Sequence, residues 1–119
     1  MIKVSKSVNK TAPIYISGPI TSLQKLGEDW KQPFVAAVAA LRRLGFREIF
    51  SPVDIAVGVE AVCEVQRRKP TYADYMRQDL KMLLKCKNIL MLRGWEGSKG
   101  ATLEYQVADT LGMEVLYER

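Results

Sequence analysis

The sequence contains no histidine among its 119 residues. This absence excludes Ser-His-Asp and Cys-His catalysis, histidine general bases and histidine metal ligands. Any acid–base or nucleophilic chemistry must therefore come from carboxylates or from Lys, Tyr, Ser, Thr or Cys side chains. The two cysteines, Cys63 and Cys86, are too few for a zinc site, and their spacing is not that of a redox motif. We expect two reduced structural thiols and no zinc site.

Long apolar runs are also missing. No segment approaches the roughly 20 consecutive apolar residues that span a bilayer, and the first residues do not resemble a signal peptide. The net charge of +5 is mild, and the basic residues are scattered rather than interleaved with aromatics, as a single-strand-binding surface requires. These features predict a cytoplasmic protein without a membrane partner. They disfavour nucleic acid as a ligand and suit a small anion.

The length fits one domain. Residues 1–12 are polar and basic and predict a loose N-terminal arm, followed by a single domain over residues 13–119. Apolar periodicity and turn signals predict strands at 14–16, 47–51, 88–92 and 114–117, and helices at 30–44, 72–85 and 99–111. Residues 53–70 fit either a helix or an irregular segment.

Helices that alternate with short apolar strands predict an α/β fold with a four- or five-stranded parallel sheet and right-handed crossovers. In such sheets a ligand binds beyond the carboxyl ends of the strands, where the strand order reverses. We therefore expect a cleft between the loop at residues 17–21 and the loop at residues 93–100.

Two acids interrupt the apolar stripes of the predicted helices. Asp79 lies on the stripe of helix 72–85, and Glu104 lies on that of helix 99–111. A buried acid is costly unless it is paired or used. Each acid also has a purely structural interpretation. Asp79 could form an ion pair with Arg77 or Lys81, and Glu104 could lie at the boundary of the core with its carboxyl group in solvent. Because both acids are expected to face the cleft, we favour a functional role.

The glycine-rich loop before the last helix suits an anion. Ser98 is a good N-cap, and the free N–H groups at a helix start attract phosphate. The glycine spacing excludes a P-loop and a dinucleotide fingerprint. Trp95 fits either stacking on a base or packing. Tyr15, on the first strand, fits either a hydrogen bond to a carboxylate across the cleft or a core position.

Three motifs in combination resemble the nucleoside 2-deoxyribosyltransferase superfamily, and the likeness is greatest to a short, phage-enriched branch of unassigned function. The motifs are IYISGPIT from Ile14 to Thr21, Asp79-Leu80 with Cys86 seven residues on, and GSKGA from Gly97 to Ala101 followed by Glu104. The resemblance implies a flavodoxin-like, Rossmann-like three-layer sandwich. It also implies cleavage of the N-glycosidic bond of a 2′-deoxynucleoside or its 5′-monophosphate, by hydrolysis or by deoxyribosyl transfer, without a cofactor.

The resemblance also implies residue roles. Glu104 matches the family nucleophile, Asp79 the aspartate near the base, and Tyr15 the tyrosine that orients the nucleophile. Ser98 stands where the nucleoside transferases carry aspartate, and it resembles the serine of the deoxynucleoside 5′-monophosphate hydrolases, which favours a phosphorylated substrate. The other expected substrate-binding residues are Ser17, Gly18, Pro19, Ile20, Trp95, Lys99 and Gly100.

Two departures from the family pattern concern Lys87 and the chain end. Cys86-Lys87 replaces the Cys-Asp that often precedes the third strand, and the chain stops at Arg119, where relatives often carry an extension that completes a neighbour's site. Relatives form sites between subunits, so we expect a homo-oligomer, either a dimer or a tetramer. Two other functions remain open: a non-catalytic nucleotide-binding module and a nucleic-acid-associated protein.

Overall fold

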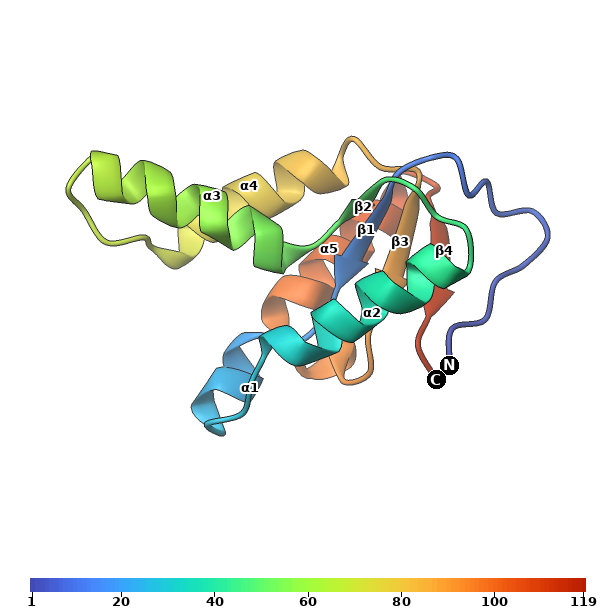
Figure 1. The fold of residues 1–119 in the computed structure, drawn as a ribbon, viewed down its shortest axis with the longest axis horizontal. Helices are drawn as coiled ribbons and strands as arrows, with labels where there is room; N and C mark the ends of the chain where they lie inside the picture. The colour runs from blue at the N-terminus through green and yellow to red at the C-terminus, as the bar shows by residue number, and fades with distance from the viewer.

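The computed structural model describes all residues from 1 to 119 as an α/β fold (Figure 1). The four strands are β1 (Ile14–Ser17), β2 (Ile49–Phe50), β3 (Asn88–Met91) and β4 (Glu114–Tyr117). All neighbours pair in parallel, in the order β2-β1-β3-β4. This flavodoxin-like sheet confirms the predicted fold class with four strands. The strand order reverses between β1 and β3, where a ligand site is expected.

Five helices connect and cover the strands. They are α1 (Thr21–Lys25), α2 (Lys31–Arg43), α3 (Pro52–Val65), α4 (Tyr72–Leu83) and α5 (Lys99–Thr110), with a 3-10 turn η1 (Trp95–Gly97). The three predicted helices are confirmed as α2, α4 and α5. The segment left open is helix α3, whose start is capped by the Ser51 hydroxyl. The sequence did not reveal α1, because a single turn without a buried residue leaves no apolar period.

The two faces of the sheet carry different cores because side chains alternate along each strand. Ile14 and Ile16 of β1 pack with Phe34 of α2 on one face. Tyr15 packs on the opposite face with the cluster that includes Leu83 of α4 and residues of α5. Figure 1 shows α2 in front of the sheet and α5 behind it, while α3 and α4 project together to one side. The molecule is therefore a three-layer sandwich with a helical hairpin at its edge.

The N-terminal residues are not the loose arm that their polarity predicted. Ile2 forms an antiparallel bridge with Glu118, and the half-buried Ile2, Val4 and Val8 pack against the core on the α2 side. The carbonyl of Asn9 accepts a hydrogen bond of 3.0 Å from the side chain of the buried Asn88. This packing was missed from the sequence because these apolar residues lie among lysines, so that the segment as a whole has a polar composition.

Two predicted absences concern the cysteines and the membrane. Cys63 and Cys86 are both buried, and neither forms a disulfide. None of the five helices combines the length and the apolar character that crossing a bilayer requires.

Candidate functional site

The side chain of Glu104, on helix α5, points toward the sheet and is held there by two hydroxyl groups of β1. The Tyr15 hydroxyl donates a hydrogen bond to Oε2 of Glu104 at 2.6 Å, and Ser17 Oγ donates to Oε1 at 2.7 Å. Tyr15 and Ser17 are two residues apart, so both point to the α5 face of the strand. All three side chains are buried, with Glu104 only 4% exposed. Both carboxylate oxygens are therefore fixed in position by the strand.

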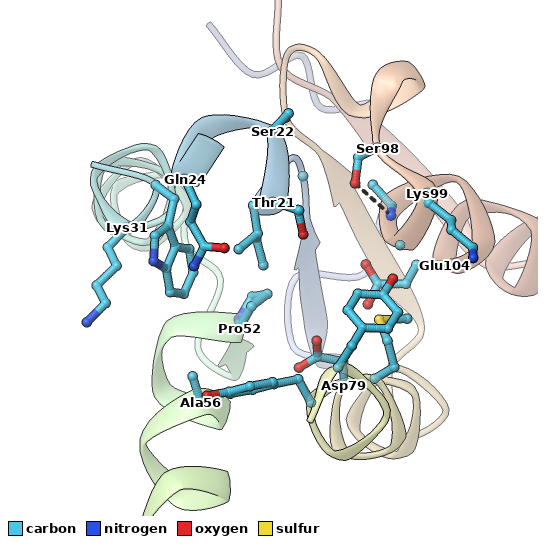
Figure 2. A pocket seen from close by; sticks show the side chains of 18 of the residues that line it. Thr21, Ser22, Gln24, Lys31, Pro52, Ala56, Asp79, Ser98, Lys99 and Glu104 are labelled. Carbon is cyan, nitrogen blue, oxygen red and sulfur yellow. Dashed lines mark hydrogen bonds between the residues drawn. The ribbon is translucent and has the colours of Figure 1, made fainter. Parts of the chain in front are cut away.

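Asp79 is a second buried acid, and it has no partner in the protein. It is 6% exposed on helix α4, and it makes no hydrogen bond or ion pair with another side chain. The ion pairs with Arg77 or Lys81 that the sequence left open do not form, since the chain's salt bridge joins Arg68 to Asp74. Figure 2 shows the carboxyl group of Asp79 pointing into the same cavity as Glu104.

The surroundings of the two carboxyl groups shift their proton affinities. Burial raises the pKa of Glu104 to about 7, although the hydrogen bonds from Ser17 and Tyr15 act in the opposite direction. Burial, followed by the charge of Glu104, raises the pKa of Asp79 to about 8. The hydroxyls of β1 thus favour the ionised form of Glu104, whereas nothing in the protein favours ionised Asp79. Paired carboxyls in different environments are suited to different roles.

The two acids share a cavity of about 800 Å³ at the carboxyl ends of the strands. This volume lies in the usual range of small-molecule sites, about 300–1,000 Å³. Helices α1 and α2 form one wall, α3 and α4 a second, and the start of α5 a third (Figure 2). Aromatic rings of Trp30, Tyr72 and Tyr75 line the walls. The cavity thus combines flat apolar surfaces with two buried carboxyl groups.

The start of helix α5 adds donors for an anion. Ser98 Oγ accepts a hydrogen bond of 3.2 Å from the Ala101 N–H, which confirms Ser98 as the N-cap. The preceding N–H groups, of Lys99 and Gly100, come before the first intrahelical bond and have no helical acceptor. Ser98, Lys99 and Gly100 all line the cavity, and Lys31 lines it from the opposite side (Figure 2). This arrangement is typical of a site for a carboxylate or phosphate.

Most of the residues predicted from the sequence come together at this site. The cavity lining includes Gly18, Ile20, Asp79, Ser98, Lys99, Gly100 and Glu104. Tyr15 and Ser17 lie behind Glu104 and act on it rather than on the cavity. Pro19 does not line the cavity, and it lies close to Gly94 at the neighbouring loop.

Trp95 is placed away from the cavity, which corrects its assignment to the substrate site. Its ring packs at 4.8 Å from the ring of Tyr105 and at 6.4 Å from that of Tyr117, measured between centroids. Trp95 and both partners are half-buried and pack against the core cluster that contains Tyr15. The 3-10 turn directs Trp95 toward α5 and β4, which the sequence of the loop did not reveal.

Several lining residues were missed by sequence reasoning. Tyr75 and Tyr72 precede Asp79 by four and seven residues, which places all three on the same face of helix α4. This helical spacing was the signal that could have found the two tyrosines. Thr21 ends the loop that the sequence placed at the cleft, whereas the lining residues Ser22, Gln24 and Lys25 of α1 had no such signal. No group of three Cys, Asp or Glu side chains is placed to hold a metal ion.

The fold and the site define a flavodoxin-like α/β domain with two buried carboxyl groups in one cavity. Residues 12–117 match a known protein family, and the chain belongs to it: the family is described as Domain of unknown function (DUF4406). No curated protein and no solved structure matches the chain at the threshold of significance. The matched range includes every residue of the site.

Proposed function

We propose that this protein cleaves the N-glycosidic bond of a 2′-deoxynucleoside or its 5′-monophosphate, with Glu104 as the nucleophile. The observation that carries the proposal is the pairing of two buried acids of unlike environment in one cavity. Glu104 is fixed by Tyr15 and Ser17, and Asp79 faces the cavity without a partner. The resemblance of the three sequence motifs to the nucleoside 2-deoxyribosyltransferase superfamily supports the same roles.

In the first step the Glu104 carboxylate attacks the anomeric carbon C1′ of the sugar. The bond between C1′ and the base nitrogen breaks, and its electron pair leaves with the base. Asp79, which the cavity keeps protonated near neutral pH, donates its proton to the leaving base. Attack by a carboxylate on an oxocarbenium-like centre follows the logic of retaining glycosidases. The products of this step are free base and a deoxyribosyl ester of Glu104.

In the second step a water molecule attacks C1′ of the ester. Asp79, now ionised, takes a proton from the water, and the carboxylate of Glu104 leaves. The sum of both steps consumes one water and yields the base and the free sugar or sugar 5-phosphate. If a second base replaces the water, the same steps transfer the deoxyribosyl group. Tyr15 and Ser17 hold both oxygens of Glu104 in place throughout.

A 5′-phosphate suits the start of helix α5. Ser98, the free N–H groups of Lys99 and Gly100, and the positive end of the helix dipole all favour an anion there. Because Asp is as good an N-cap as Ser, Ser98→Asp keeps the helix start but adds a negative charge. We expect this variant to raise KM for a monophosphate by about tenfold or more, and to change KM for the unphosphorylated nucleoside little.

The central test is incubation of the full chain with 2′-deoxynucleosides and with their 5′-monophosphates, with the free base followed by chromatography. We expect base release that falls by at least about 10³-fold in Glu104→Gln, since the nucleophile is lost. Glu96→Gln is the matched control, because Glu96 is an exposed acid outside the cavity lining. The proposal fails if no substrate releases base, or if Glu104→Gln releases it at the wild-type rate.

The same substrates also test the non-catalytic reading of this cavity. A nucleotide-binding module raises its melting temperature with added nucleotide, retains that shift in Glu104→Gln, and yields no base. An enzyme of the proposed kind accumulates a deoxyribosyl adduct when the second step is slow. The adduct adds the mass of the sugar to the chain, and peptide mapping is expected to locate it on Glu104.

A further inference from the structure

Helix α3 is apolar on more than one side. Asp54, Glu60 and Glu64 are its only polar residues among 14. Its buried residues, which include Ala56, Val59 and Cys63, face α4 and the rest of the protein. A helix that covers the edge of a domain normally turns polar residues to solvent. The outer side of α3 departs from this pattern.

The exposed side of α3 carries an apolar stripe, with the exposed Glu60 and Glu64 along one of its edges. Val57, Ala61 and Val65 follow one another at four-residue spacing, and Gly58 and Val62 lie beside them. Val57 is 62% exposed, Val62 56% and Val65 85%. A Cβ added to Gly58 would meet nothing within 4 Å, so a neighbouring backbone has room to approach. We call these five residues the α3 stripe.

A groove of about 460 Å³ runs beside the α3 stripe, between α3 and α4. Its floor includes Ile55, Val59 and Met82, and its rim carries Asp54 and Arg77. The groove lies apart from the cavity of the two acids, with which it shares no lining residue. Figure 1 shows α3 and α4 projecting together from the body of the protein.

The charges at the two ends of the α3 stripe have opposite sign. Asp54 lies in the first turn of α3, and Arg67 follows its last turn. Both are exposed, and neither takes part in the chain's salt bridge. Asp54 and Arg67 are seven and six residues from Ala61, so Ala61 lies close to the midpoint of the stripe. Such a pattern is self-complementary under a two-fold axis.

We propose that the α3 stripe is the contact between two copies of this chain, packed antiparallel about a two-fold axis beside Ala61. In this arrangement Val57 of each copy meets Val65 of the other, and Asp54 of each copy faces Arg67 of the other. Gly58 and Ala61 let the two helices approach closely. The contact buries the apolar side of α3 and pairs the charge at each end with one of opposite sign.

The oligomeric state of the full chain tests the proposal. We expect a dimer by sedimentation equilibrium at about 10 μM, and monomers for Val57→Glu and Val62→Glu, because a charge in the centre of an apolar contact is left unpaired. Val35→Glu is the matched control, since Val35 is a 52% exposed valine on α2. Circular dichroism shows whether each variant is folded. A wild-type monomer at about 100 μM, well above the dissociation constant of a stable dimer, overturns the proposal.

A charge exchange tests the antiparallel register without touching the apolar residues. Asp54→Arg and Arg67→Asp each place like charges opposite one another, and each is expected to raise the dimer dissociation constant by about tenfold. The double variant restores opposite charges at both ends, and its constant is expected within about threefold of wild type. Aspartate tolerates the positive φ of 57° at residue 67 better than most residues. If the double variant is weaker than either single variant, the antiparallel contact is wrong.

The dimer and the proposed chemistry rest on different residues. If Val57→Glu is a folded monomer that still releases base, the contact between copies is lost while the glycosidic chemistry is intact. If Glu104→Gln is a dimer that releases no base, the chemistry is lost while the contact is intact. Failure of one proposal is therefore distinguishable from failure of the other.

Discussion

Glu104 and Asp79 occupy positions where an apolar residue would stabilise the fold more. Each lies on the inner face of a helix, and burial raises the pKa of both above the usual carboxyl range. Folding therefore favours the neutral form of each acid, and ionising them in the folded protein costs stability. Tyr15 and Ser17 reduce this cost for Glu104 through two hydrogen bonds, whereas Asp79 has no such compensation. This cost is the usual signature of a site retained for function.

The stability of the protein is expected to fall as the pH rises from about 4 to about 8. In this range the folded protein binds more protons than the unfolded chain, because the pKa of Asp79 is about 8 and that of Glu104 about 7 when folded. Asp79→Asn removes one ionisation and should raise the free energy of unfolding by about 2 kcal/mol at pH 8. The gain should be smaller at pH 5 and should vanish below about pH 4, where the Asp79 carboxyl is neutral in both the folded and the unfolded state.

Urea unfolding at pH 5 and pH 8 measures both values. The exposed Asp109→Asn serves as the control and should change stability little at either pH. Two results together contradict the assignment of Asp79 as a buried acid without a partner. The first is a wild-type protein that is more stable at pH 8 than at pH 5, and the second is an Asp79→Asn variant that is less stable than wild type at pH 8.

The rate of base release is expected to have a narrow bell-shaped dependence on pH. Glu104 must be ionised, which requires a pH above about 7, and Asp79 must be protonated, which requires a pH below about 8. Asp79→Asn should lower kcat/KM by about 10²–10⁴-fold and abolish the fall at high pH, because the acid is lost. Initial rates measured from pH 5 to pH 9.5 for both proteins check this. A fall at high pH that persists in Asp79→Asn assigns the acid to another group.

At the scale of elements, the site depends on how closely the loops after β1 and β3 approach. Gly18 follows β1, and a Cβ at Gly18 would lie 2.8 Å from the Cβ of the buried Leu92. The φ angle of Gly18 is not in the left-handed region, so only the close approach requires glycine here. Gly18 lines the cavity, and its neighbour Ser17 binds Glu104. The glycine therefore couples loop packing to the position of the nucleophile.

Gly18→Ala should destabilise the protein by about 1–3 kcal/mol, because the added methyl group overlaps the buried side chain of Leu92. Gly97→Ala is the matched control, since a Cβ at Gly97 would meet no atom within 4 Å. Thermal denaturation of the two variants under the same conditions checks the difference. Equal melting temperatures for wild type and Gly18→Ala would show that the loops have more room than the structure gives them.

At the scale of the whole molecule, the N-terminal residues close the fold against its C-terminal end. The Met1 amino group donates a hydrogen bond of 2.9 Å to the carbonyl of Arg119, and Ile2 bridges Glu118. Figure 1 shows the two termini side by side, next to the end of β4. The start of the chain thus pairs with the two residues that follow β4 and occupies their backbone groups.

Replacing Ile2 and Val4 by serine is expected to lower the free energy of unfolding by about 1–2 kcal/mol, because two half-buried side chains leave the core. The control replaces the adjacent exposed residues, Lys3 and Lys6, by serine and should leave stability nearly unchanged. Urea unfolding measures both. If the two pairs have equal effects, the segment contributes charge rather than packing.

Local patterns in the sequence predict most of the helices, all four strands and the two buried acids. Apolar periodicity places α2, α4 and α5 and all four strands close to their observed bounds, because each element must bury one face whatever its neighbours are. The same periodicity singles out Asp79 and Glu104, since an acid on an apolar stripe is visible without knowing what it faces. Ser98 as a helix cap is equally local and equally readable.

The partners of these residues, by contrast, follow from the tertiary packing. Tyr15 and Ser17 reach Glu104 across 89 and 87 residues of chain, and Asp79 is left unpaired although Arg77 and Lys81 flank it. Trp95 packs half-buried against Tyr105, and the N-terminal Ile2, Val4 and Val8 pack against the core. These outcomes depend on which faces meet once the strands adopt the order β2-β1-β3-β4. Local patterns encode burial, whereas the identity of a neighbour is set by packing between segments that are distant in sequence.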